Sequence, residues 1–134
     1  MKKHRIYVVD DDDDDLEHVN EVIKTLGCGE EVLLLHSVKE LMTVLNRSIA
    51  MLPDLIILDH QLPGTGGDEA IRQLRSDSRY DKTALAVYSS HLMPHKENEL
   101  KQSGVDACFS KGVSMEEITG HVRSFCEAVE RRRG

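Results

Sequence analysis

The sequence predicts an α/β protein built on a doubly wound, five-stranded parallel sheet. Five short runs of aliphatic and β-branched residues alternate with five segments of helical periodicity along the 134 residues. Short, unbroken apolar runs are typical of strands that are buried on both faces of a parallel sheet. Because the connections are short and no linker or repeat interrupts the pattern, we expect one domain over residues 1–134.

The N-terminal half supplies two of the expected strands and two of the helices. Unbroken apolar runs predict strands at about residues 5–10 and 32–35. The helix between them, residues 14–27, places its apolar residues on one face and ends at a glycine, which commonly closes helices. The second helix is expected at residues 38–50, with Ser37 as its N-cap.

The C-terminal half supplies three strands and three helices. The strands are expected at residues 55–58, 84–88 and 106–110, and the helices at residues 67–76, 94–103 and 114–130. The last helix carries one clean apolar stripe, whereas the helix at 94–103 has Leu100 as its one strong apolar anchor. A helix with so little buried area should be locally unstable, and we hypothesise that it is a mobile output element.

The composition argues against several classes of function. The net charge is −7, and the basic cluster 131–133 suits the C-terminal end of the last helix better than a nucleic-acid surface. No apolar stretch approaches the roughly 20 residues of a membrane span, and the N-terminus does not resemble a signal peptide. Three cysteines without a Cys-x-x-Cys pattern favour a reduced compartment. We therefore expect a cytoplasmic protein that binds neither nucleic acid nor membrane.

Three carboxylates end two of the expected strands. Asp10 and Asp11 follow the first strand, and Asp59 follows the third. In the flavodoxin-like strand order 2-1-3-4-5 these two strands are neighbours, and ligands bind beyond their carboxyl ends. Three acids in a small space repel one another, so a positive charge must balance them, and a hard divalent cation is the natural candidate.

Two further strand ends add polar groups to the same edge of the sheet. Ser89 follows the fourth apolar run, and Lys111 follows the fifth. Carboxylates, a hydroxyl and an ammonium group together suit phosphoryl transfer to a carboxylate, because a bound cation, the lysine and the hydroxyl can each stabilise a phosphoryl oxygen. One carboxylate would act as the nucleophile and become an acyl phosphate.

On these residues the whole chain resembles a response-regulator receiver domain of two-component signalling. Four motifs match in order, each at a strand end: Asp10–Asp11, Asp59, Ser89 and Lys111. After the phosphoacceptor, Leu62 takes the place of the family's Met before Pro63, and Gly67 matches a later glycine. The resemblance implies a stand-alone phosphorylation switch with no output domain, which is not an enzyme beyond catalysing its own phosphotransfer and autodephosphorylation.

The resemblance also implies a role for each site residue. The implied protein ligands of Mg²⁺ are Asp10, Asp11, Asp59 and the backbone carbonyl of Gln61. Asp11 would bind the ion directly and Asp10 more through water. Lys111 would pair with Asp59 at rest and with phosphoryl oxygen afterwards, while Ser89 would move toward the phosphoryl group. The donor would be a histidine kinase or a phosphotransfer protein, and a downstream protein would bind the face of the fourth helix, fifth strand and fifth helix.

Two further positions depart from the family pattern. Cys108 stands where the family often has Tyr or Phe, and Phe109 lies next to it on the other strand face. Gly112 stands where the family usually has Pro after the lysine, often in a cis bond. Because a non-proline cis bond costs about 3 kcal/mol, we expect a trans bond and a reshaped loop.

We expect two neighbours of the motif residues, His60 and the run Asp12–Asp15, to take no direct part in metal binding or catalysis. Alternation along a strand would place His60 away from the acid cluster. The run Asp12–Asp15 is interpreted as a solvated loop and first helical turn, where acids suit the helix N-terminus.

Two other functions fit part of the pattern. A phosphatase of the haloacid-dehalogenase type would use Asp10 and Asp12 after the first strand, then Ser89 and Lys111, but it would leave Asp59 idle. A pseudo-receiver would act only as an interaction module. It would require a missing site residue, and the core set is complete, but the altered positions Cys108 and Gly112 keep this alternative open.

Overall fold

Five strands within the described residues form one parallel sheet in the computed structural model, which describes residues 2–47, 51–62 and 66–133. They are β1 (His4–Val9), β2 (Gly29–Leu35), β3 (Leu55–Leu58), β4 (Ala84–Ser89) and β5 (Ala107–Ser110). Their order across the sheet is β2-β1-β3-β4-β5, and all neighbours are parallel. The predicted doubly wound, flavodoxin-like sheet with the order 2-1-3-4-5 is confirmed.

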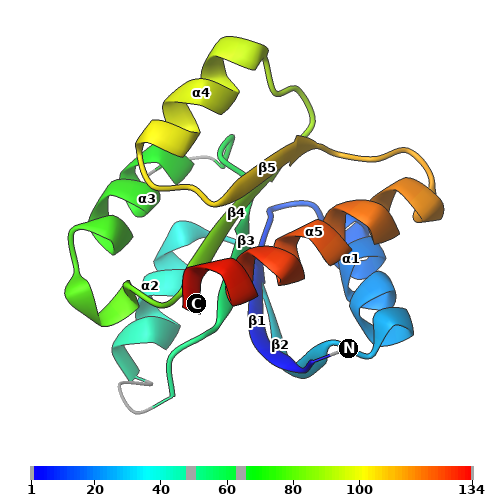
Figure 1. Cartoon of the computed structure of the whole chain (residues 1–134), viewed down its shortest axis with the longest axis horizontal. Coiled ribbons are helices and arrows are strands. Elements are labelled where there is room, and N and C mark those ends of the chain that lie inside the picture. Colours follow the sequence, from blue (N-terminus) through cyan, green and yellow to red (C-terminus); the bar gives the residue numbers. More distant parts are fainter. Residues whose placement is uncertain (1, 48–50, 63–65, 134) are drawn as a thin grey trace.

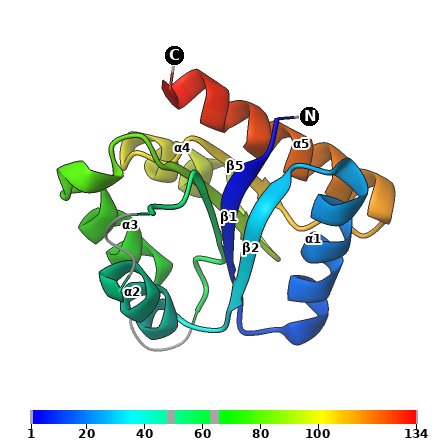
Figure 2. The ribbon, with the colours of Figure 1, turned by 90° about the horizontal axis from the view of Figure 1, so that it is seen from below.

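Helices cover both faces of this sheet. In the described ranges they are α1 (Asp13–Leu26), α2 (Val38–Arg47), α3 (Gly67–Arg75), α4 (Pro94–Gln102), α5 (Met115–Arg133) and a short 3-10 helix at Ser78–Tyr80. Helices α1 and α5 lie on one side of the sheet, and α2, α3 and α4 lie on the other (Figure 1, Figure 2). In that part of the chain, no helix is long and apolar enough to cross a membrane.

Strand residues alternate between two hydrophobic layers. In β1, Ile6 and Val8 pack in the layer that contains α1 and α5, whereas Tyr7 and Val9 pack in the layer of α2 and α3. Both layers are buried, so each interior strand position is apolar whichever way its side chain points. This burial explains the unbroken apolar runs from which the sheet was predicted.

Local interactions set the element boundaries in the N-terminal half. Gly27 ends α1 in the left-handed conformation, with φ 67°. Ser37 Oγ accepts a hydrogen bond from the backbone N–H of Glu40 at 3.1 Å, as expected of an N-cap. Strand β2 begins at Gly29, earlier than predicted, because pairing with β1 continues through two exposed glutamates that carry no apolar signal.

The end of α5 differs from the prediction, whereas the predicted end of α2 falls outside the described residues. Helix α5 continues to Arg133 because its last turn is anchored: Arg132 Nη1 lies 3.1 Å from Asp106 Oδ1, and Arg133 pairs with Asp54. Helix α2 is described as far as Arg47, and the predicted continuation over 48–50 lies outside the described residues.

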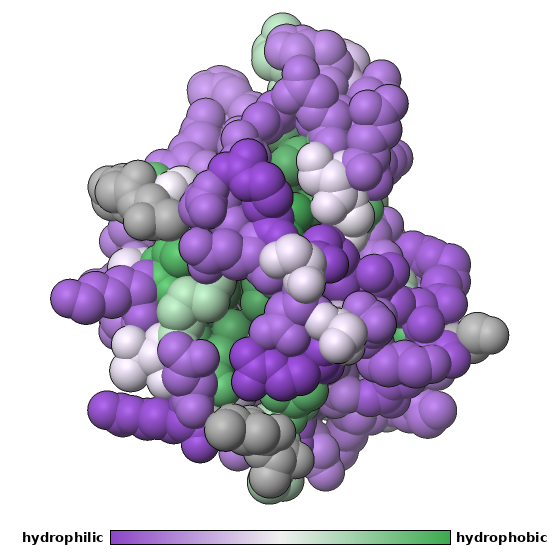
Figure 3. Space-filling model, turned by 90° about the vertical axis from the view of Figure 1, so that its left-hand side faces the viewer, coloured by the Kyte–Doolittle hydropathy of each residue, from purple (hydrophilic) through white to green (hydrophobic). Residues whose placement is uncertain are grey.

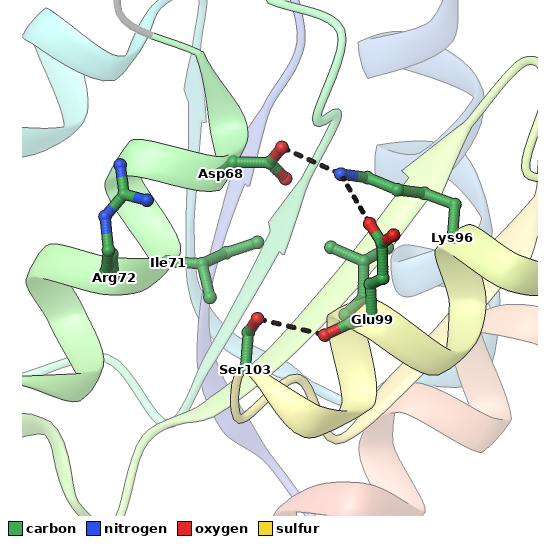
Figure 4. Close-up of a pocket in the computed structure, with 7 residues that line it drawn as sticks. Asp68, Ile71, Arg72, Lys96, Glu99 and Ser103 are labelled. Carbon is green, nitrogen blue, oxygen red and sulfur yellow. Dashed lines mark hydrogen bonds and ion pairs between the residues drawn. The ribbon is translucent and has the colours of Figure 1, made fainter.

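Helix α4 has little buried apolar surface. Among its residues, all of which the structure describes, Leu100 is the one that is buried. A hollow of about 170 Å³ separates it from α3, and Lys96 Nζ reaches to within 2.8 Å of Asp68 Oδ2 on α3 (Figure 4). The side of the molecule that carries α2, α3 and α4 is mostly hydrophilic, with hydrophobic side chains visible mainly in hollows (Figure 3). The weak anchoring is confirmed, and mobility stays a prediction.

Candidate functional site

Three carboxylates meet at the carboxyl edge of the sheet. Strands β1 and β3 are neighbours with Val9 opposite Leu58, so the residues that follow them, Asp10 and Asp59, leave the sheet side by side. One oxygen from each of Asp10, Asp11 and Asp59 lies within 4.8 Å of the others. The convergence predicted from the strand ends is confirmed.

The ammonium group of Lys111 lies among these acids. Its Nζ is 2.7 Å from Asp10 Oδ2 and 3.0 Å from Asp59 Oδ2, and the side chain is 13% exposed. The predicted resting pair between Lys111 and Asp59 is confirmed. A third carboxylate, Asp15 Oδ2, lies 2.7 Å from the same nitrogen.

Asp15 corrects the prediction that the whole run 12–15 is solvated. Helix α1 starts directly after the site, and its first turn directs Asp15 back over the sheet edge to Lys111. The helical periodicity of this segment could have indicated that Asp15 faces the site. Its composition indicated only that acids are favourable at a helix N-terminus. Asp12 behaves as expected, since its side chain caps α1 by accepting from the N–H groups of Asp14 and Asp15.

The carboxylate of Asp59 is held on both oxygens. Ser89 Oγ donates to Oδ1 at 2.7 Å, and the backbone N–H of Gln61 donates to the same atom at 3.0 Å. Lys111 occupies Oδ2. Ser89 was expected to move toward the phosphoryl group; its hydroxyl is bonded to Asp59 here, and the movement stays a prediction. The role predicted for the backbone carbonyl of Gln61 stays a prediction, and residues 63–65 of this loop lie outside the described ones.

The surroundings move the pKa values of the two buried acids in opposite directions. Burial alone would raise the pKa of Asp59, but hydrogen bonds from a loop N–H, Ser89 and Lys111 lower it below its ordinary value. For Asp10 burial dominates and raises the pKa, despite the hydrogen bond from Lys111. Burial would lower the pKa of Lys111, but its three carboxylate partners raise it above the ordinary value. At neutral pH, Asp59 is therefore an ionised carboxylate beside a charged lysine.

The donor set fits a hard divalent cation. Asp10, Asp11 and Asp59 each direct a carboxylate oxygen to one small volume, and all three ligand atoms are of the type that Mg²⁺ prefers. Asp10 and Asp59 are buried while Asp11 is exposed, so the cluster opens to solvent on one side. Such a site leaves room for the water ligands that Mg²⁺ usually retains.

Among the described residues, the acid cluster does not include His60, as predicted, but the His60 side chain lies beside the hydroxyl of Ser89. Its ring Nδ1 lies 2.7 Å from Ser89 Oγ, and its backbone N–H donates to the same oxygen at 3.2 Å. Strand β3 ends at Leu58, so His60 belongs to the turn after the strand, where the alternation of strand side chains no longer applies.

The loop after β5 has the trans backbone that was predicted for Gly112, and the reshaping of the loop stays a prediction. The described peptide bonds include no cis bond. The N–H of Gly112, a group that proline lacks, donates to Tyr88 Oη at 2.9 Å, and this oxygen also lies 2.9 Å from Nδ1 of His121 on α5. A Cβ at position 112 would come within 2.9 Å of the Glu117 Cβ, so the approach of α5 also favours glycine.

The aromatic side chains near the lysine pack on the α5 side of the sheet. Phe109 stacks on His121 with ring centroids 4.4 Å apart, and Tyr88 meets Phe125 edge-on at 5.5 Å. Cys108 is buried in the opposite layer, with α2, α3 and α4. The predicted separation of Cys108 and Phe109 onto two strand faces is confirmed.

The fold and the site together define a doubly wound α/β protein with an acidic, lysine-bearing site at its switch point. Comparison with known families gives the same result: the model of the response regulator receiver domain matches residues 6–123. The chain belongs to the response-regulator receiver family of two-component signalling.

Individual relatives share only modest sequence identity with this chain. The chain is 32% identical over 78 residues to hybrid signal transduction histidine kinase D of Dictyostelium discoideum, a match that covers 58% of this chain and 5% of that protein. It is 29% identical over 73 residues to the polar-differentiation response regulator DivK of Brucella ovis, covering 54% of this chain and 59% of DivK. The two component response regulator from Cytophaga hutchinsonii has a similar fold, with a TM-score of 0.86, 22% identity and coverage of 98% of this chain and 99% of that one.

Proposed function

We propose that this chain is a phosphorylation switch of a two-component or phosphorelay pathway, with Asp59 as the phosphoacceptor. The observation that carries the proposal is the hydrogen bonding of the Asp59 carboxylate, with Ser89 Oγ on Oδ1 at 2.7 Å and Lys111 Nζ on Oδ2 at 3.0 Å. Both groups are donors, and both lie where the oxygens of a phosphoryl group on Asp59 would have to be stabilised.

The proposed reaction transfers a phosphoryl group from a phosphohistidine to the carboxylate. An oxygen of Asp59 attacks phosphorus, the O–P bond forms, and the P–N bond breaks. The electron pair of that bond returns to the donor's imidazole, which leaves as a neutral ring because its other nitrogen carries a proton. Lys111 and Ser89 donate hydrogen bonds to the phosphoryl oxygens as negative charge accumulates there. Lowering of the Asp59 pKa keeps the nucleophile ionised.

Mg²⁺ is the cation proposed for the acid cluster. Its protein ligands would be Asp10, Asp11, Asp59 and the backbone carbonyl of Gln61. When bound, the ion supplies positive charge that offsets the negative charge of the phosphoryl oxygens. The support is the donor set, which places three carboxylate oxygens within 4.8 Å of one another.

The proposed partners follow from the family. A histidine kinase or a phosphotransfer protein would donate the phosphoryl group, and the relatives of this chain include a hybrid histidine kinase. Output would pass by protein contact through the face of α4, β5 and α5. In this proposal the chain catalyses only its own phosphorylation and the hydrolysis of its acyl phosphate, so it is not a turnover enzyme.

The phosphatase alternative has less support. It would need the Asp12 carboxylate as an acid near the reacting group, but Asp12 Oδ1 already accepts two backbone hydrogen bonds as the cap of α1. It would also make Asp10 the nucleophile, although burial raises the pKa of Asp10 and disfavours its ionised form.

Identifying the phosphorylated residue tests the proposal. The protein is incubated with acetyl phosphate and Mg²⁺, and the product is followed by intact-mass spectrometry, with the site trapped by borohydride reduction. We expect a single label on Asp59 that hydroxylamine releases, as it does an acyl phosphate, and that disappears in Asp59→Asn and persists in Asp68→Asn, an exposed carboxylate on α3. Labelling of Asp10, or full labelling of Asp59→Asn, would overturn the assignment.

A further inference from the structure

His60 lies next to the predicted switch hydroxyl and has no role in the family motifs described above. Its ring Nδ1 is 2.7 Å from Ser89 Oγ, and Ser89 Oγ is 2.7 Å from Asp59 Oδ1. The three side chains therefore form one chain of hydrogen bonds that ends on the phosphoacceptor. Ser89 is completely buried, so no water competes for its hydroxyl.

The number of hydrogens available fixes the direction of this chain. The Ser89 hydroxyl has one hydrogen, and the ionised carboxylate of Asp59 can only accept. If the hydroxyl donated to His60 instead, two oxygens would face each other at 2.7 Å with no hydrogen between them, which is repulsive. The hydroxyl therefore donates to Asp59, and His60 Nδ1 carries a hydrogen that it donates to the hydroxyl oxygen.

The backbone of His60 is held in place by its contacts, so the fold itself determines the direction of the imidazole ring. Its N–H donates to Ser89 Oγ at 3.2 Å, and its carbonyl accepts from Gly67 N at 3.3 Å. The start of α3 packs so closely that a Cβ on Gly67 would lie 2.4 Å from the His60 Cα. This contact gives a physical reason for glycine at position 67.

We propose that His60 is a positioning residue that directs the Ser89 hydroxyl hydrogen toward the phosphoryl group accepted by Asp59. The inference rests on the proposed phosphorylation of Asp59 and deepens it. With two donors on its oxygen, one from the His60 ring and one from the His60 backbone, the hydroxyl can donate in one direction only. The hydrogen is thus oriented before the phosphoryl group arrives, which removes the cost of reorienting it in the transition state.

The test compares four substitutions in the full chain, using acetyl phosphate with Mg²⁺ and measuring the rate against donor concentration. Loss of a single preorganised donor lowers a rate by roughly 100-fold in comparable sites, so Ser89→Ala should lose about that much. His60→Leu should lose roughly 10-fold in maximal rate, with a nearly unchanged half-saturating donor concentration, because a backbone donor to Ser89 remains. His60→Asn should restore most of the rate, since its amide N–H takes the place of Nδ1. His60→Gln should not, since its amide reaches the place of the other ring nitrogen.

A double substitution separates positioning from a general structural effect. In the Ser89→Ala background, His60→Leu should cause no further loss, because the group through which it acts is gone. Equal rates for His60→Leu and wild type, equal rates for the Asn and Gln variants, or additive losses in the double variant would each overturn the inference. Failure of the wild-type chain to be phosphorylated at all would instead overturn the proposed function. If His60→Leu does not fold, the Asn and Gln pair still decides the question.

Discussion

Replacement of Lys111 by methionine tests whether this lysine balances the acid cluster. Methionine keeps the length and apolar volume of the stem but removes the ammonium group. In the wild-type chain that group lies 2.7 Å from both Asp10 and Asp15 and 3.0 Å from Asp59. The substitution leaves these acids close together with no protein cation between them.

The magnitude follows from burial. Removing one partner of a buried ion pair typically costs 3–5 kcal/mol, roughly, because an uncompensated charge stays behind. Lys111 is 13% exposed and Asp15 is 34% exposed, so solvent screens part of the cluster. We therefore expect a loss near the lower limit, about 3 kcal/mol in the free energy of unfolding. For a chain of this size that corresponds to roughly 10 °C in Tm.

The assay is thermal unfolding in EDTA and in Mg²⁺, with Lys96→Met as the matched control. Lys96 also pairs with a carboxylate at 2.8 Å, but that partner, Asp68, is 53% exposed, so the control should lose less than about 1 kcal/mol. Mg²⁺ should raise the Tm of Lys111→Met more than that of wild type, because the ion binds and neutralises the carboxylates that the substitution leaves unpaired.

Two results would refute this reasoning. A Lys111→Met protein as stable in EDTA as wild type would mean that Asp10, Asp15 and Asp59 do not depend on the lysine for charge balance. A Mg²⁺-induced rise in Tm no larger than in the Lys96→Met control would mean that the cation and the lysine do not act on the same acids.

Three further predictions concern pH, the loop after β5 and α4. Because the pKa of Asp59 is lowered in the fold, its ionised form stabilises the protein above the unfolded pKa, and this contribution is lost as pH falls through the lowered value. The pKa of Asp10 is raised, so its contribution is present at low pH and lost as pH rises. Asp10→Asn should therefore raise Tm at neutral pH, and Asp59→Asn should not; the opposite order in calorimetry would contradict the shifts. Tyr88→Phe removes the acceptor for Gly112 N–H and should cost about 1 kcal/mol in denaturant unfolding while weakening the coupling of α5 to the site, seen as smaller α5 amide shifts with beryllofluoride. Amides of α4 should exchange faster than those of α5 and change on phosphorylation, and equal, unchanged protection would remove α4 as the mobile output element.

Much of the fold and the centre of the site could be predicted because a parallel sheet obeys simple geometry. Apolar runs such as residues 55–58 mark strands that are buried on both faces, and parallel strands end at one edge. The residue that follows each run must therefore reach the same place. This rule predicts from the sequence that Asp10, Asp59 and Lys111 lie together. Boundaries were less predictable, as at β2, where backbone pairing extends the strand without an apolar signal.

Side-chain directions away from the strand ends were decided by the tertiary structure alone. Asp15 reaches Lys111 because the rotation of α1 about its axis depends on how the helix packs against β2 and α5. His60 reaches Ser89 because the chain leaves strand geometry after Leu58 and because Gly67, at the start of α3, packs closely against the His60 backbone. The sequence by itself determined which charged groups at the strand ends share the edge of the sheet, since strand direction and order decide that. Which of them touch depends on loop backbones and helix rotations that arise only when the layers pack.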